Sequence, residues 1–175
     1  GSKKDNAQSG ASYVHEAVLR TSGQWSMGSR LLPQFQSVAG GPYTNRGYPV
    51  SIAAGDNAVN LSAEYRLHVP QMFGINPQPG RLFGEPFRWV PQHHNGRADW
   101  DLALVGFIDY SWLTQARRRS YELDQTMVSA GVGFDFSLRH NWRVRLDWGY
   151  ALRSLEGGLY DSGHNRIYVQ TSLSF

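Results

Sequence analysis

The fold class of this chain is decided by residues 57–69, NAVNLSAEYRLHV. Side chains of a β-strand alternate between its two faces, so every second residue of this stretch lies on the same side. The apolar face carries Val59, Leu61, Ala63, Tyr65, Leu67 and Val69. The mainly polar face carries Ala58, Asn60, Ser62, Glu64, Arg66 and His68. Strands of about nine to eleven residues with one apolar and one polar face are typical of transmembrane barrels.

The same alternation recurs along the chain. It predicts five further strands, at residues 12–25, 100–112, 126–139, 142–152 and 166–175. The inner faces of the later strands carry charged residues, including Asp135, Arg143, Arg145 and Asp147. Such charges are costly in an apolar core, but they can pair or be hydrated in a polar lumen. The pattern therefore favours an all-β, antiparallel transmembrane barrel over the alternative of a soluble β-sandwich or lipocalin-like barrel with its faces swapped.

The number of strands is a separate question. The alternation identifies six strands, whereas 175 residues fit an eight-stranded barrel with about 22 residues for each strand and its connection. We expect eight strands, with the two others supplied by residues 26–38 and by part of 70–90. The alternative is a chain that closes only with partners, because an open sheet edge is not viable in lipid.

The domain organisation follows from composition. Residues 1–11 are polar and are expected to be disordered, and Gly1-Ser2 is typical of a cloning remnant. Residues 12–175 form one predicted barrel domain. Within it, the Gly- and Pro-rich residues 26–56 predict a long lumenal or extracellular loop, and residues 70–99 predict a long periplasmic connection.

Several classes of function are disfavoured. The chain contains no run of about eighteen apolar residues, so no transmembrane helix is predicted. Its net charge is +3, but it has no basic tract of the kind that forms a nucleic-acid interface. The histidines are candidates for chemistry, namely His15, His68, His93, His94, His140 and His164. They show neither a nucleophile elbow nor a metal-ligand spacing, and His93-His94 in a Pro-rich loop is typical of a solvated pair. We therefore expect no enzymatic activity, no cofactor and no metal.

Four stretches and the last residue carry a resemblance to a known family. They are GGPYTNRGYP (40–49), AGDNAVNLSAEYRL (54–67), LVGFIDYS (104–111), SAGVGFDFSLRHNWRVRLDWGYAL (129–152) and the terminal Phe175. In this order they resemble the C-terminal barrel part of the BamA/TpsB outer-membrane protein superfamily. That superfamily contains outer-membrane assembly factors and two-partner-secretion transporters of the haemolysin-activator type. The stretch SGQWSMGSRLLPQFQSVAGG (22–41) is similar to the transporter branch.

The resemblance implies a site. Arg46, Gly47 and Tyr48 match the Arg-Gly-Phe/Tyr tip of the family's sixth extracellular loop, which folds back into the lumen. Asp109 matches the strand aspartate that the loop arginine meets, and Glu64 is the second implied partner. The alternation agrees, since it places Glu64 and Asp109 on the polar faces of their strands, where an arginine can be paired. The terminal Phe175 resembles the assembly signal of outer-membrane strands.

The resemblance also implies a function and a location. It implies protein translocation or outer-membrane protein assembly in the bacterial outer membrane, with a polypeptide substrate and a surrounding bilayer of lipid and lipopolysaccharide. Family members receive their substrate through periplasmic POTRA domains, and none is recognisable here beside about the last six strands of a sixteen-strand barrel. A small structural or scaffold barrel without transport is the alternative, and a homo-oligomer is a further expectation for closure. No nucleic acid is expected as a partner.

Overall fold

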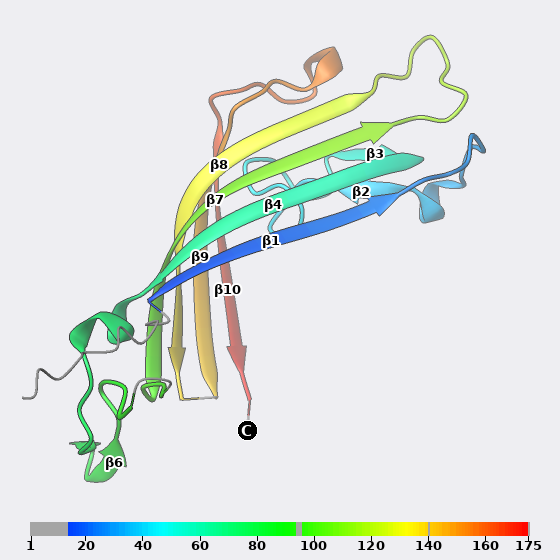
Figure 1. The fold of residues 1–175 in the computed structure, drawn as a ribbon. Coiled ribbons are helices and arrows are strands. Elements are labelled where there is room, and N and C mark those ends of the chain that lie inside the picture. Colours follow the sequence, from blue (N-terminus) through cyan, green and yellow to red (C-terminus); the bar gives the residue numbers. More distant parts are fainter. Residues whose placement is uncertain (1–13, 94–95, 140, 175) are drawn as a thin grey trace, which may run out of the picture.

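The central element of the molecule is a six-stranded antiparallel sheet. A computed structural model describes residues 14–93, 96–139 and 141–174. The sheet has the order β1-β4-β7-β8-β9-β10 (Figure 1). Its strands are β1 (His15–Gln24), β4 (Asn57–His68), β7 (Trp100–Thr114), β8 (Gln125–Leu138), β9 (Trp142–Ala151) and β10 (Asn165–Leu173). They coincide with the six strands predicted by alternation, to within three residues at each end, so the all-β fold is confirmed.

The long connections contain small elements of their own. β2 (Ser37–Ala39) pairs with β3 (Ala53–Gly55), and β5 (Gly80–Leu82) pairs with β6 (Glu85–Phe87). The described residues also contain three short 3-10 helices: η1 (Pro33–Phe35), η2 (Val69–Phe73) and η3 (Glu156–Gly158). None of the helices in these residues has the length and apolar composition to cross a membrane.

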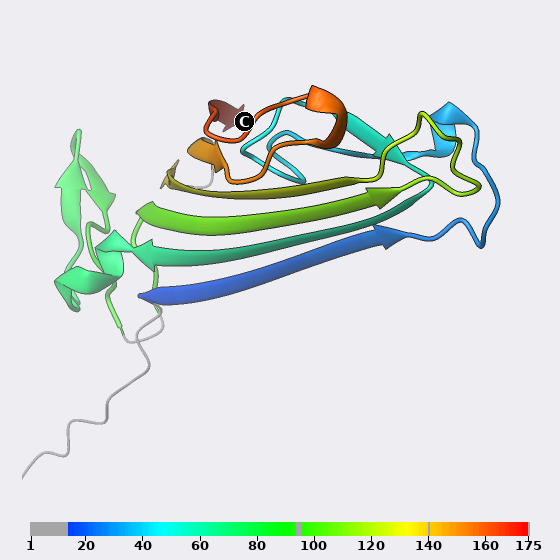
Figure 2. The ribbon, with the colours of Figure 1, turned by 90° about the horizontal axis from the view of Figure 1, so that it is seen from above.

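The expected eight-stranded closed barrel is not what the described residues form. β1 and β10 are the two edges of an open sheet, and each pairs with a single neighbour. Neither stretch expected to add a strand joins the large sheet: residues 26–38 contain η1 and the start of β2, and residues 70–90 contain the β5–β6 hairpin. A physical reason is their composition, since glycine weakens a strand and proline lacks the N–H that a central strand must donate. The sheet is nevertheless strongly curved, and the segment with β2 and β3 lies on one side of it (Figures 1 and 2).

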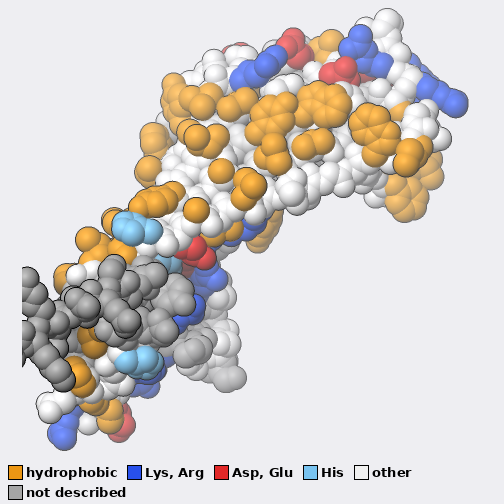
Figure 3. All heavy atoms as spheres, viewed as in Figure 1, with side chains coloured by type: hydrophobic (Ala, Val, Ile, Leu, Met, Phe, Trp, Pro, Cys, Tyr) orange, Lys and Arg blue, Asp and Glu red, His pale blue; other side chains and the backbone are white. Residues whose placement is uncertain are grey.

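The two faces of the sheet have opposite polarity. We call the face beneath β2 and β3 the inner face. Its buried polar side chains include Asn60, Glu64, Asp109, Ser129, Asp135 and Asp147. The outer face exposes large hydrophobic side chains, including Leu19, Leu61, Tyr65, Leu104, Ile108, Val132, Phe134, Trp148, Ile167 and Val169. Hydrophobic side chains spread over the visible outer surface of the sheet in Figure 3. The predicted alternation is therefore confirmed, and the described residues place no second layer on the apolar face as a sandwich would.

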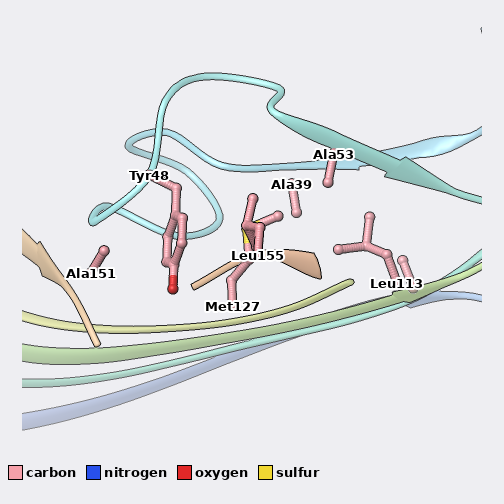
Figure 4. Close-up of a cluster of buried hydrophobic side chains, with 8 residues drawn as sticks. Ala39, Tyr48, Ala53, Leu113, Met127, Ala151 and Leu155 are labelled. Atoms are coloured by element: carbon pink, nitrogen blue, oxygen red, sulfur yellow. The ribbon is translucent and has the colours of Figure 1, made fainter. Parts of the chain in front are cut away.

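A small apolar cluster seats the long loop on the inner face. It contains Ala39, Tyr48, Ala53, Ala58, Leu113, Met127, Ala151 and Leu155. Figure 4 shows Tyr48 pointing from the loop toward the sheet, beside Met127 and Leu155. Because the cluster joins the loop to β4, β7, β8 and β9, burial of its apolar surface fixes the loop against the sheet.

Candidate functional site: a loop arginine buried against the inner face

The tip of the long loop is a compact turn built on two glycines. Gly40 and Gly41 have φ values of +106° and +95°, in the region that favours glycine. The Gly41 N–H donates to the carbonyls of Asn45 (3.0 Å) and Tyr48 (3.1 Å). This turn presents Arg46 and Tyr48 to the sheet, where their exposed fractions are 2% and 0%.

Two further glycines allow the loop to touch the sheet directly. A Cβ atom on Gly47 would lie 2.5 Å from Ser129 Cβ and 2.9 Å from the backbone nitrogen of Ala151. A Cβ atom on Gly149 of β9 would lie 2.4 Å from the carbonyl oxygen of Arg46. Contacts this short are not tolerated, so both positions require glycine for the close approach of two backbones.

Arg46 binds Asp109 of β7 through a two-pronged contact. Its Nε donates to Asp109 Oδ2 (2.8 Å) and its Nη2 donates to Oδ1 (2.6 Å). The backbone N–H of Arg46 donates to Asp109 Oδ2 as well (3.0 Å). Nη2 also donates to Ser62 Oγ (3.0 Å), and the guanidinium lies 3.4 Å from the centroid of the Phe107 ring. Bidentate, charge-assisted bonds of this kind are the strongest that arginine makes.

Glu64 of β4 is the second acidic partner. Its Oε1 accepts from Arg46 Nη1 (2.7 Å) and Arg145 Nη2 (2.9 Å), and Arg20 Nη1 lies 3.0 Å away. Its Oε2 accepts from Arg66 Nη2 (2.7 Å). The carboxylate therefore meets four guanidinium groups while its own residue is only 4% exposed. The structure thus brings together Arg46, Asp109 and Glu64, the three charged residues that the resemblance implied.

The site also contains residues that the sequence did not assign to it. Asp147 of β9 accepts from Arg145 Nε (2.7 Å) and lies 3.8 Å from Arg46 Nη1. Alternation placed both on the inner face, but it did not give the height at which they meet Arg46. We call the set of Arg20, Arg46, Glu64, Arg66, Asp109, Arg145 and Asp147 the charged cluster; its four cations and three carboxylates nearly balance. It connects the loop to β1, β4, β7 and β9, and such a network is stable in a low-dielectric site only when its members are paired.

Tyr48 anchors the same loop to the other half of the sheet. Its Oη donates to the carbonyl of Arg153 (2.6 Å), and it accepts from the N–H of Val128 (3.3 Å). Its own carbonyl accepts a hydrogen bond from Tyr168 Oη of β10 (2.6 Å). Tyr168 was not assigned a role from the sequence, because a tyrosine on an inner face has no signal that identifies a backbone partner.

We expect Tyr48→Phe to lower the free energy of unfolding by roughly 1–3 kcal/mol, because it leaves the Arg153 carbonyl and the Val128 N–H without the hydroxyl. Chemical unfolding in a single detergent measures this difference. Tyr43→Phe is the matched control on the same loop, since Tyr43 is 87% exposed, and it should change stability by less than about 0.5 kcal/mol. Equal effects of the two substitutions would mean that the Tyr48 hydroxyl does not anchor the loop.

Two carboxylates, Asp56 and Glu122, hold together the loops at the end of the sheet where β4 begins. Burial acts to raise the pKa of Asp56, but hydrogen bonds from Gln36 and from the backbone N–H groups of Leu31 and Ala116 outweigh it and hold the pKa below its ordinary value. Across the surface, a hydrogen bond from Arg30 lowers the pKa of Glu122 to about 2. Asp56 through its three donors, and Glu122 through Arg30, thus link the residues after β1 to the connection between β7 and β8.

The predicted assembly signal, Phe175, and two of the candidate histidines, His94 and His140, lie outside the described residues. In the part of the chain that the structure describes, no group of three or more His, Asp or Glu side chains is arranged to hold a metal ion. A cavity of about 450 Å³ lies at the charged cluster, lined mainly by the loop tip, β1 and β4, with Gln170 contributed by β10. What the arrangement does chemically is bind a loop, through charge pairs and a tyrosine, to the inside of a curved sheet.

Comparisons of the chain with family models, with curated proteins and with solved structures found no match.

Proposed function

We propose that this chain belongs to an outer-membrane β-barrel of the BamA/TpsB type, which acts in protein translocation or in outer-membrane protein assembly. One observation carries the proposal. Arg46, in an Arg-Gly-Tyr loop tip, is buried against Asp109 and Glu64 on the inner face of a sheet whose outer face is apolar. A loop that folds back against acidic strand residues in this way agrees with the family geometry that the sequence resembles.

The polarity of the sheet supports a bilayer as its surroundings. The six strands contain 9 to 15 residues each, and about nine to eleven residues of a tilted strand cross the hydrocarbon core. Exposed hydrophobic side chains, aliphatic or aromatic, lie on every strand of the outer face. They are unfavourable in water, whereas lipid removes that cost. The buried charges then face a lumen rather than an apolar core.

The open edges define what the proposal requires for closure. In lipid, the unpaired backbone groups of β1 and β10 would each lack a hydrogen-bond partner, at a cost of several kcal/mol per group. The barrel must therefore be closed by further strands, either from the sixteen-strand barrel that the family resemblance implies or from other copies of the chain. β1 and β10 run in opposite directions because the sheet is an antiparallel meander of six strands, so either form of closure keeps all neighbours antiparallel.

A structural or scaffold barrel is the second candidate. The observation that favours it is the coverage of the inner face by the long loop, whose Arg46 and Tyr48 are 2% and 0% exposed against the sheet. A barrel whose interior is filled by side chains conducts nothing.

The bilayer part of the proposal predicts detergent dependence. We expect the purified protein to remain monodisperse in detergent and to aggregate after detergent removal, because its apolar outer face then meets water. Size-exclusion chromatography with light scattering measures this. A protein that stays monodisperse in plain buffer, with the same melting temperature in both conditions, would rule out the membrane assignment.

The functional part is tested in the producing bacterium by deleting the gene and comparing proteins of the medium and of the outer membrane. Loss of one secreted polypeptide indicates transport, and a general decline of other β-barrels indicates assembly. If neither changes, the scaffold alternative is favoured. Sequencing the reading frame upstream of Ser12 adds an independent test, since POTRA domains are expected for a transporter or an assembly factor.

A further inference from the structure

His68, the last residue of β4, lies between carboxylates of the two neighbouring strands. Its Nδ1 is 2.7 Å from Asp101 Oδ2 of β7, and its Nε2 is 3.3 Å from Glu16 Oε2 of β1. The imidazole thus spans three adjacent strands at the end of the sheet where β1 begins. This site is separate from the charged cluster that holds the loop, although Arg66 touches both.

The number of protons on His68 decides how many of these contacts are hydrogen bonds. A neutral imidazole has one N–H donor, whereas an imidazolium has two. Both ring nitrogens face carboxylate oxygens, which accept but do not donate when ionised. Only the protonated ring can therefore donate to Glu16 and Asp101 together, and the neutral ring must leave one carboxylate facing a lone pair. Histidine is the side chain that ordinarily changes charge between about pH 5 and 8.

Other charged groups around the ring do not replace this contact. Arg66 Nη1 is 3.6 Å from Glu16, but Arg66 Nη2 is bound more closely to Glu64, at 2.7 Å. Arg143 acts on Asp101 electrostatically, while its guanidinium is bound to Asp135. His68, Glu16 and Asp101 line a hollow of about 460 Å³. The other charged or titratable residues that line it include His15, Arg88, Arg97, Asp99 and Arg139. Within that group Arg88 and Asp99 neutralise each other at 2.6 Å. Among the described residues, the Asp101 carboxylate accepts a side-chain hydrogen bond from His68 and from no other group.

We propose that His68 is a proton-dependent brace that fastens the edge strand β1 to β4 and β7. When the ring takes up a proton from solvent, it donates to both carboxylates, and the first residues of β1 are held. When it releases the proton, one contact is lost and this end of β1 loosens. Among the described strands β1 pairs with β4 alone, so the brace controls how readily this end of β1 separates from β4 at one rim of the sheet, with or without a further strand on its other side. The inference depends on the sheet alone and does not require a membrane.

Hydrogen–deuterium exchange of β1 tests the brace. Protection factors, corrected for the intrinsic effect of pH, are measured for residues 15–18 at about pH 5.5 and about pH 8 in the full chain. We expect protection to be about two- to fivefold higher at the lower pH, the effect of one partly exposed ion pair. His68→Gln should abolish this pH dependence and Glu16→Gln should reduce it.

His15→Gln is the matched control, because His15 precedes Glu16 directly and, among the described residues, its imidazole makes its hydrogen bond to the Tyr65 hydroxyl rather than to a carboxylate. It should leave the pH dependence in place. The proposal is overturned if His68→Gln retains the pH dependence, if His15→Gln removes it, or if the native chain shows none. A Glu16→Gln variant that matches the native chain at both pH values would also contradict it, since the brace acts through that carboxylate.

Discussion

Arg46→Ala is expected to lower the free energy of unfolding by roughly 3–5 kcal/mol, the cost of removing one partner from a buried ion pair. The loss falls mainly on Asp109, which would keep the Ser62 hydroxyl (2.7 Å) and the backbone N–H of residue 46 (3.0 Å) as donors but lose both guanidinium bonds from Arg46. Glu64 would suffer less, since three other guanidinium groups remain within 3.0 Å of it. Chemical unfolding in a single detergent gives the value. Arg117→Ala is the control, because Arg117 is an exposed arginine in the connection after β7, and its loss should be small.

The pairing itself is tested by a double-mutant cycle. Asp109→Ala should reproduce much of the effect of Arg46→Ala, and the double variant should cost less than the sum, because the second change removes a charge that is already unpaired. A cycle with Glu64→Gln in place of Asp109→Ala should show weaker coupling. Additive effects of Arg46 and Asp109 would contradict the contact on which the proposed function rests.

Gly47→Ala is expected to displace the loop from the sheet. The new Cβ would lie 2.5 Å from Ser129 Cβ and 2.9 Å from backbone atoms of Tyr150 and Ala151, so the two backbones must separate. Separation breaks the Arg46 contacts as well, so the loss of stability should equal that of Arg46→Ala, roughly 3–5 kcal/mol. Limited proteolysis should cut within residues 40–50 in the variant and spare them in the native protein.

Gly106→Ala is the control for this substitution. Gly106 lies in β7, and a Cβ placed there meets nothing within 4 Å. It should leave both the stability and the proteolysis pattern unchanged to within about 0.5 kcal/mol. A loop that stays protected in Gly47→Ala would show that the approach of loop and sheet is looser than the structure has it.

The sequence predicted the strands because their alternation is local. Residues 57–69 and 126–139 each give a period of two over many residues, and the same parity placed Glu64 on the inner face. Asp109 and Arg46 were brought together by the family resemblance, with parity in agreement. None of this required knowledge of strand register.

What the sequence did not predict depends on register and on backbone partners. Whether Arg145 reaches Glu64 depends on the register of β9 relative to β8, β7 and β4. The alternation of side chains gives the face of each residue but does not give this register. The partners of Tyr48 include backbone carbonyls, which every residue has, so no sequence signal identifies them. The prediction of eight strands differs from the structure for a related reason. Chain length limits how many strands are possible, but it does not make Gly- and Pro-rich stretches into barrel strands.

The proposed function requires that the apolar face of the sheet meets lipid while the opposite face does not. The chain contains no cysteine, so single cysteines can carry spin labels at outward Val132 and Ile108 and at inward Ser137 and Ser172. In lipid vesicles, we predict that labels at the outward pair collide mainly with oxygen, which concentrates in the bilayer. Labels at the inward pair should collide mainly with a water-soluble nickel complex. If the nickel complex reaches Val132 and Ile108 as readily as Ser137 and Ser172, the apolar face does not lie in lipid, and this contradicts an outer-membrane barrel.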